Sequence, residues 1–177
     1  ELKKQGYTHI LLAVGAWKPG KLDIAGDVAG AIQWMKGVKA GNIAVAGNIV
    51  VVGGGNTAMD AARLAKRSGA ESVTLVYRRT RKYMPADEHE LALALADGVT
   101  FAELAAPVKQ ADGVLKGEKM VLGEADASGR RSPVGSGEFF TVPCDLVISA
   151  VGEQVDDALM AANGIEVDKK GRPAFQT

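Results

Sequence analysis

Runs of apolar residues alternate with amphipathic stretches and turns along the chain, which is the pattern of an α/β protein. Residues 48–52 predict a buried strand, residues 57–68 an amphipathic helix closed by Gly69, and residues 73–77 a second buried strand. Strands nearly free of polar groups are typical of a parallel sheet that is covered on both faces. The central segment therefore predicts a strand–helix–strand unit of about 30 residues.

Further segments extend this pattern in both directions. Residues 107–142 alternate in short segments separated by turns, which predicts an antiparallel meander. The predicted fold class is thus α/β, with a Rossmann-like parallel sheet, helices on both faces and a β-meander. The remaining predicted elements are a helix tail at 1–5, a buried strand at 8–14, helices from Asp27 to about Lys39 and at 86–96, strands at 99–101 and 146–151, a helix at 156–162 and a turn at Lys170–Gly171.

Bulk composition narrows the possible partners. The chain has 177 residues, 47% of them hydrophobic, with 21 basic and 21 acidic side chains. This balance produces no overall field that would attract nucleic acid or an anionic membrane, so any anion site must be local. No run approaches the roughly 20 apolar residues of a membrane span, and the amino end lacks a signal peptide's apolar segment. Cys144 is the single cysteine, which fits a reducing, cytoplasmic location. The missing initial methionine favours a piece of a longer protein.

The glycine-rich turn after residue 52 is the strongest candidate site. Gly53, Gly55 and Ala58 match the G-x-G-x-x-G/A spacing between a predicted strand and a predicted helix. In a dinucleotide site the first position permits the tight turn, the second lets the pyrophosphate approach the backbone, and the third allows close helix packing. Asn56 and Thr57 can add side-chain donors. The sequence therefore predicts a phosphate-binding loop at the start of a helix.

The end of the second strand indicates which dinucleotide binds. An NAD site usually has a carboxylate about 20 residues after the glycine motif, where it holds the ribose hydroxyls. Here Arg78 stands 20 residues after Ala58, and Arg79 follows. A guanidinium at this position can pair with the 2′-phosphate of NADPH through charge-assisted hydrogen bonds. The pair of arginines therefore favours NADPH over NADH, although a solvated basic loop is the simpler alternative.

Longer motifs carry a resemblance to a known family. The stretches GGGNTAMD, YRR and RKYMPADEHE, followed by GVTFAELAAPV and DLVISAVG, occur in order along residues 7 to 177. They resemble the pyridine-nucleotide domain of the glutamate synthase small subunit and its relatives, which include dihydropyrimidine dehydrogenase and iron–sulfur flavoproteins described as selenate reductase subunits. The resemblance implies a glutathione-reductase-like NAD(P)-binding domain inserted into an FAD domain.

This resemblance also implies a domain division and a function. Residues 1–30 would be an edge of the FAD-binding domain and a connector, residues 31–152 the inserted NADPH-binding domain, and residues 153–177 the return segment. The parent enzyme would pass hydride from NADPH to FAD and electrons onward to iron–sulfur clusters in other domains or subunits. The piece alone would be inactive. The implied cofactor-binding residues are Gly53, Gly54, Gly55, Asn56, Thr57, Ala58, Arg78, Arg79, Ala150, Val151 and Gly152.

Two other functions remain open from the sequence. S-adenosylmethionine also binds beside a glycine loop, so a methyltransferase-like domain is one alternative, although Arg78 stands where that ligand needs an acid. A noncatalytic assembly module with the same fold is the other. No catalytic acid or base and no metal ligand is assigned. The remaining candidates are interpreted as structural: His9, His89 and Cys144. Trp17 and Trp34 are expected to pack between domains, with cover of a nucleotide ring as the alternative.

Overall fold

A computed structural model describes residues 2–9, 11, 13–16, 18–125, 127, 129, 131–168 and 173 of the chain. It forms two compact units, one comprising residues 19–153 and the other residues 1–18 with 154–177. The short strands β1 (Lys18–Pro19) and β10 (Glu153–Gln154) pair in a two-stranded sheet. Among the described residues no helix combines the length and apolarity needed to cross a membrane.

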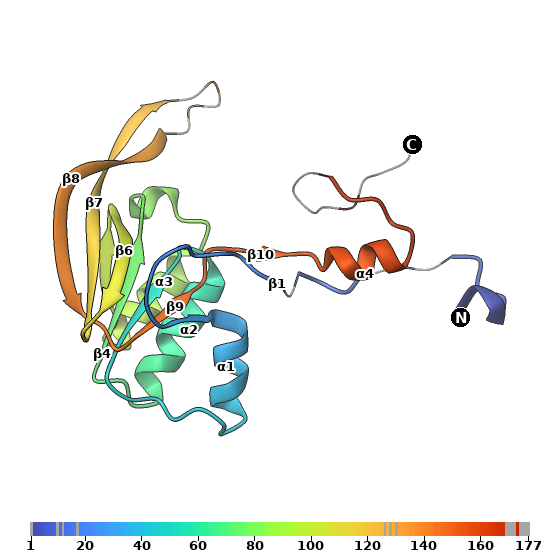
Figure 1. Cartoon of the computed structure of the whole chain (residues 1–177), viewed down its shortest axis with the longest axis horizontal. Coiled ribbons are helices and arrows are strands. Elements are labelled where there is room, and N and C mark those ends of the chain that lie inside the picture. Colours follow the sequence, from blue (N-terminus) through green and yellow to red (C-terminus); the bar gives the residue numbers. More distant parts are fainter. Residues whose placement is uncertain are drawn as a thin grey trace. The chain divides into compact units, whose positions relative to one another are not determined.

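The larger unit is built on a five-stranded parallel sheet with the strand order β2-β9-β3-β4-β5 (Figure 1). The central strands β3 and β4 confirm the two buried strands predicted around the glycine turn, and their side chains are almost fully buried because both faces of the sheet are covered. The strands are β2 (Val28–Gly30), β3 (Asn48–Val52), β4 (Ser72–Tyr77), β5 (Thr100–Glu103) and β9 (Leu146–Ser149).

Three helices cover one face of this sheet. They are α1 (Ala31–Lys39), α2 (Asn56–Arg67) and α3 (Glu88–Ala96), and they enclose a core that includes Ile49 and Val51 of β3. The alanines that α2 turns toward the sheet are fully buried, so the helix lies close to the strands. Gly69, with φ of +107°, ends this strand–helix–strand unit in the conformation that favours glycine.

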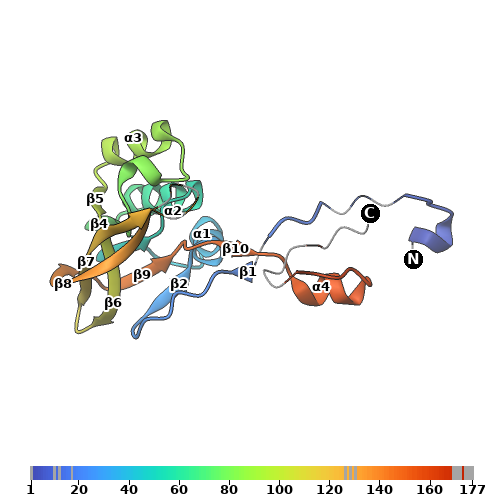
Figure 2. The ribbon, with the colours of Figure 1, turned by 90° about the horizontal axis from the view of Figure 1, so that it is seen from above.

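The antiparallel meander covers the other face. It consists of β6 (Ala105–Ala111), β7 (Val114–Ala125) and β8 (Arg131–Pro143), in sheet order β6-β7-β8. Leu115 and Cys144 pack there against Val50 and Val52 of β3, in a second buried cluster. Figure 2 shows the helices on one side of the parallel strands and the meander on the other. The predicted fold class is confirmed, with the difference that the meander takes the place of helices on the second face.

Two predicted elements differ from the structure. The predicted helix from Asp27 begins only at Ala31, because residues 28–30 form strand β2 and pair with β9. The spacing of apolar residues at 28–30 suits either a helix or a strand. Pairing with a strand more than 100 residues away makes this segment a strand. The predicted strand at 8–14 is wrong for its described residues: none is in a strand, and Leu11 is 92% exposed. A strand needs a hydrogen-bonded neighbour, and no described strand pairs with this segment.

The described residues of the smaller unit include two short helical segments. A 3₁₀ turn spans Leu2–Gln5, and α4 spans Asp157–Ala162, near the helix predicted at 156–162. Asp156 caps α4 by accepting from the backbone N–H groups of Ala158 and Leu159. The predicted turn at Lys170–Gly171 and Trp17 lie outside the described residues.

Candidate functional site

A cavity of about 1000 Å³ opens at the carboxyl ends of the central parallel strands. Segments that follow three different strands line it: the glycine turn after β3, the two arginines after β4, and the loop after β9. Ligands of open α/β sheets bind at this edge, outside the carboxyl ends of the strands. The lining residues used below are Lys21, Ile24, Gly53, Gly54, Gly55, Thr57, Tyr77, Arg78, Arg79, Ala150, Val151, Gly152 and Glu153.

The first two glycines of the turn are required by close packing. Gly53 has φ of +156°, and a Cβ atom there would stand 2.5 Å from the carbonyl oxygen of Ala150. Its N–H donates to the carbonyl oxygen of Val76 at 3.1 Å, which fixes the turn to β4. A Cβ atom on Gly54 would collide with the ring of Tyr77. These two glycines therefore shape the loop from within the protein.

Gly55 is different because nothing lies within 4 Å of the place its Cβ would take. Its backbone is extended, with φ of −98°, and it stands at the N-cap of α2, where no side chain caps the helix. Backbone N–H groups of a first helical turn have no partner within the helix and carry partial positive charge. Ala58 is fully buried against the sheet. The open space at Gly55 and the uncapped helix start fit a phosphate group.

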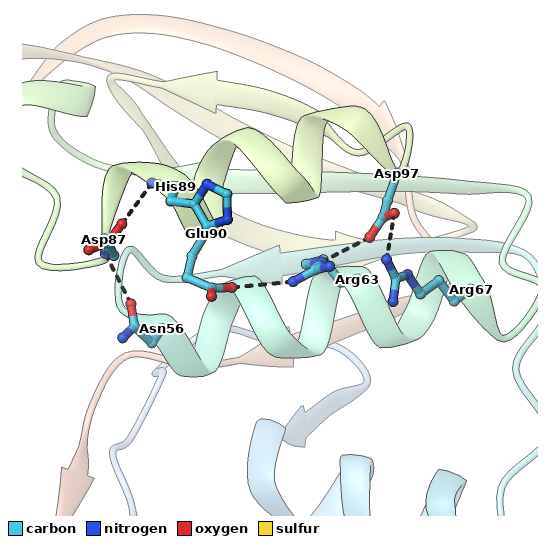
Figure 3. A network of polar contacts seen from close by, with 7 residues as sticks. All are labelled: Asn56, Arg63, Arg67, Asp87, His89, Glu90 and Asp97. Atoms are coloured by element: carbon cyan, nitrogen blue, oxygen red, sulfur yellow. Dashed lines mark hydrogen bonds and ion pairs between the residues drawn. The ribbon is translucent and has the colours of Figure 1, made fainter.

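Asn56 and Thr57 both form hydrogen bonds within the protein. Asn56 Oδ1 accepts from the backbone N–H of Asp87 at 3.1 Å, and the Thr57 hydroxyl donates to Glu153 Oε1 at 2.8 Å. Figure 3 shows the first of these contacts beside the ion pairs that join α2 to α3. In that network Arg63 contacts Glu90 and Asp97, and Arg67 contacts Asp97. The start of α2 is thus tied to α3 and to the chain after β9.

The two arginines after β4 line the same cavity as the glycine turn. Arg78 is exposed and Arg79 is partly buried. Arg79 Nε is buried and has no hydrogen-bond partner within the described residues. An unsatisfied buried donor is costly to leave without a partner, so an anion at this place would offset that cost. Two guanidinium groups that line the same cavity as Gly55 favour an anionic ligand there.

The loop after β9 brings the third predicted group into contact with the first. The Ala150 N–H donates to the carbonyl oxygen of Val52 at 2.8 Å, and the Ala150 carbonyl lies against Gly53. Gly152 has φ of +121° and accepts a hydrogen bond from the Gly20 N–H at 2.8 Å. All three predicted segments therefore meet at one cavity.

Sequence reasoning missed two contributors to this cavity. The connector at residues 21–24 lines it, and Gln110 helps to hold the chain there by accepting from the Asp27 N–H at 2.9 Å and donating to the Cys144 carbonyl at 3.1 Å. Glu153 was also missed. Its position directly after an apolar strand that ends in glycine was the available signal.

The candidates interpreted as structural have different surroundings. Trp34 is 3% exposed in the core under the helix face of the larger unit, so its expected packing between domains is wrong. The backbone N–H of His89 donates to Asp87, whose carboxylate caps α3. Burial raises the pKa of the Cys144 thiol to about 11, so it is a thiol at neutral pH. The sequence contains no second cysteine, so this chain supplies no dithiol pair.

A parallel sheet with a glycine-rich turn leading into a helix, backed by a β-meander, defines a dinucleotide-binding α/β domain. The pyridine nucleotide-disulphide oxidoreductase family model matches residues 1–176, and the chain belongs to this family.

Individual relatives agree with this family. The chain is 42% identical to the Escherichia coli K12 oxidoreductase YgfK, over 98% of this chain and 17% of that protein. It is 37% identical to the small chain of NADPH glutamate synthase from Azospirillum brasilense, over 89% of this chain and 37% of that one. The resemblance noted from the sequence motifs is therefore confirmed. The chain spans well under half the length of each of these two relatives.

A solved structure shares the fold. FprA of Mycobacterium tuberculosis, determined in complex with NADPH, superposes with a TM-score of 0.61 at 19% identity, covering 80% of this chain and 49% of that one. At this identity the likeness concerns the fold alone. The fold and the family together favour a dinucleotide ligand and give no support to the methyltransferase alternative.

Proposed function

We propose that this chain is the NADPH-binding part of a longer flavin-dependent oxidoreductase. One observation carries the proposal: Arg78 and Arg79 line the same cavity as Gly53–Gly55. A phosphate loop after one strand and a ribose-recognising residue after the next is the arrangement of a dinucleotide fold. The relatives named for NADPH support the choice of cofactor.

Each part of the cavity has a separate task in this proposal. Gly55 and the start of α2 hold the pyrophosphate, with Asn56 and Thr57 beside it. Arg78 and Arg79 hold the 2′-phosphate. The backbone of residues 150–152 flanks the nicotinamide half. The complete proposed set is Gly53, Gly54, Gly55, Asn56, Thr57, Ala58, Arg78, Arg79, Ala150, Val151 and Gly152.

The protein's own contribution is positional. Hydride chemistry is supplied by the nicotinamide and by a flavin when both are bound. This chain binds and orients the nucleotide, and no acid or base in it is assigned a proton transfer. The Thr57 hydroxyl, the backbone N–H groups of the glycine turn and the guanidinium groups of Arg78 and Arg79 would hold the ligand at several points along its length. Such multipoint binding is what places a nicotinamide ring against a second cofactor.

The rest of the enzyme is also part of the proposal. The chain spans 17% of YgfK and 37% of the glutamate synthase small chain, which leaves room for further domains. We assign residues 1–30 to an edge and connector of an FAD-binding domain, residues 31–152 to the NADPH-binding domain and residues 153–177 to the return segment. Electrons would leave the flavin for iron–sulfur clusters elsewhere in a cytoplasmic enzyme.

Replacing Arg78 tests the cofactor assignment. The Arg78→Ala variant should weaken NADPH binding by roughly 10- to 100-fold, about 1.5 to 3 kcal/mol, because a charge-assisted contact to the 2′-phosphate is lost. Binding of NADH, which lacks that phosphate, should scarcely change. Isothermal titration of both nucleotides into the 177-residue chain measures the two effects.

Lys82→Ala is the matched control. This substitution also removes one positive charge, four residues further along the chain, and Lys82 does not line the cavity. The affinity of the Lys82→Ala variant for both nucleotides should equal that of the unchanged chain. Equal losses of NADPH and NADH affinity in Arg78→Ala would exclude the 2′-phosphate role. Absence of binding of either nucleotide to the unchanged chain would exclude the proposed function as a whole.

A further inference from the structure

The connector that leads into strand β2 is bonded to the rest of the larger unit at both of its ends. At one end the Gly20 N–H donates to the Gly152 carbonyl oxygen at 2.8 Å, and a Cβ atom on Gly20 would lie 2.8 Å from the same oxygen. At the other end the Asp27 N–H donates to Gln110 Oε1 at 2.9 Å. Between these two ends, residues 21–24 line the cavity. The connector is therefore a wall of the cavity with two fixed ends.

Gln110, on strand β6, fixes the end of the connector that is nearer to β2. Besides accepting from Asp27, its side chain donates to the Cys144 carbonyl oxygen at 3.1 Å, and its backbone N–H donates to the Ala25 carbonyl oxygen at 2.8 Å. Gly26 passes so close that a Cβ atom there would lie 2.5 Å from Gln110 Oε1. One side chain thus joins the connector to the chain just before β9.

The middle of the connector packs beside the glycine turn. Leu22 and Ile24 are partly buried and pack against the meander-side cluster that contains Val52. Val52 is the last residue of β3 and directly precedes Gly53. A displacement of the connector would therefore change the shape of the cavity next to the proposed phosphate loop.

The connector and the two arginines lie on different sides of the glycine turn. The connector leads into β2 and is bonded to the loop after β9, whereas Arg78 and Arg79 follow β4. In the order β2-β9-β3-β4, strands β2 and β4 are three places apart, about 14 Å at the usual strand spacing. The proposed function assigns the 2′-phosphate to the arginines and the nicotinamide half to residues 150–152. The connector consequently borders the nicotinamide half.

Resting on the proposed function, we propose that residues 21–24 form the nicotinamide-side wall of the nucleotide site and that Gln110 is the residue that positions this wall. Gln110 does not itself line the cavity, so it acts through the connector. Its hydrogen bonds hold residues 21–24 in place before the ligand enters. A wall that is already ordered does not have to be ordered by the ligand, and binding is tighter by that cost.

The test compares NADPH with adenosine 2′,5′-bisphosphate, which has the same 2′-phosphate but ends at its 5′-phosphate and lacks the nicotinamide half. Gln110→Met keeps a side chain of similar length and removes both side-chain hydrogen bonds. It should weaken NADPH by roughly 3- to 10-fold, the range expected when a segment must be ordered on binding. Affinity for the bisphosphate should change by less than about 2-fold. Isothermal titration gives both dissociation constants, and a general loss of stability would not change their ratio.

Gly26→Ala breaks the same contact from the other side, because the new methyl group would meet Gln110. It should change the ratio of the two affinities in the same direction as Gln110→Met. Ser72→Ala is the matched control. The Ser72 hydroxyl donates to Asn48 Oδ1 at 2.8 Å at the amino ends of β4 and β3, and Ser72 does not line the cavity. This control removes a part-buried hydrogen bond from the same unit and should leave both affinities unchanged.

Hydrogen–deuterium exchange gives a second readout on the unchanged chain. NADPH should slow exchange in peptides that cover residues 20–27, because the nicotinamide half contacts this wall. Adenosine 2′,5′-bisphosphate should leave the exchange of the same peptides unchanged. In the free Gln110→Met variant these peptides should exchange faster than in the unchanged chain, since the Asp27 N–H has lost its acceptor.

The outcomes separate this proposal from the proposed function. If NADPH responds to Arg78→Ala while Gln110→Met and Gly26→Ala leave the ratio of the two affinities unchanged, the wall proposal alone is wrong. Should these two variants fail to fold, the exchange of the unchanged chain decides. Protection of residues 20–27 by both ligands, or by neither, would then overturn the wall. If the unchanged chain binds neither ligand, the proposed function fails and the wall fails with it.

Discussion

Gly53 and Ala150 lie in direct backbone contact, and a Cβ atom on Gly53 would stand 2.5 Å from the Ala150 carbonyl oxygen. The contact joins the turn after β3 to the loop after β9, two segments nearly 100 residues apart. Neither segment can shift without the other. The positions of the proposed phosphate loop and of the proposed nicotinamide side of the cavity are therefore coupled.

Gly53→Ala should destabilise the protein. The new methyl group meets the Ala150 carbonyl, and the φ of +156° is unfavourable for a residue with a side chain. Strain of this kind costs about 1 to 3 kcal/mol. Urea unfolding of the variant should show a lower midpoint at an unchanged slope. A midpoint equal to that of the unchanged chain would mean that the turn relaxes freely, contrary to the tight contact described.

Gly55→Ala should leave the stability of the protein intact and weaken nucleotide binding. The new methyl group enters open space, and the backbone angle at this position is ordinary for alanine. We expect the unfolding midpoint to be unchanged or slightly higher. NADPH affinity should fall by roughly 10-fold or more, since the methyl group occupies the approach of the pyrophosphate to the backbone. Titration calorimetry together with urea unfolding separates the two effects. Retained affinity would place the phosphates elsewhere.

The ion pairs of Asp97 make stability depend on pH at the acidic end. Hydrogen bonds from Arg67 and Arg63 hold the pKa of Asp97 below its ordinary value. A depressed folded-state pKa contributes stability above the unfolded pKa, near 4, and this contribution is lost as pH falls through the folded value. Asp97→Asn should therefore lower the urea midpoint at pH 7. The difference from the unchanged chain should shrink below about pH 4, and a pH-independent difference would contradict this assignment.

Cys144 should be inert in the folded protein. At pH 8 a thiol with a pKa of about 11 is only about 0.1% thiolate, and Cys144 is also fully buried. Ellman's reagent should therefore react very slowly in native buffer. In concentrated urea it should release the signal of one thiol per chain, as expected for a single cysteine. Rapid reaction under native conditions would show that the cluster around Cys144 opens readily.

The parts of the site that sequence predicts are those set by local order. The strand, glycine turn and helix from β3 to α2 follow one another directly, so spacing alone predicted them and placed Arg78 at the end of β4. Contacts between distant segments were not predictable in this way. The Glu153 side chain reaches Thr57 only after the sheet order is established, and strand β2 was assigned to a helix because its partner β9 lies far along the sequence.

The alternation along β3 has a consequence for how the site can change. Ile49 and Val51 face the helices, while Val50 and Val52 face the meander, and all four are at most 6% exposed. The glycine turn thus follows a strand that is packed between two separate cores, and a shift of one residue would move every side chain of the strand to the opposite face. New ligand preferences can arise more easily at the solvent-facing ends of β4 and β9, where Arg78 and Glu153 can be exchanged while the anchor stays in place.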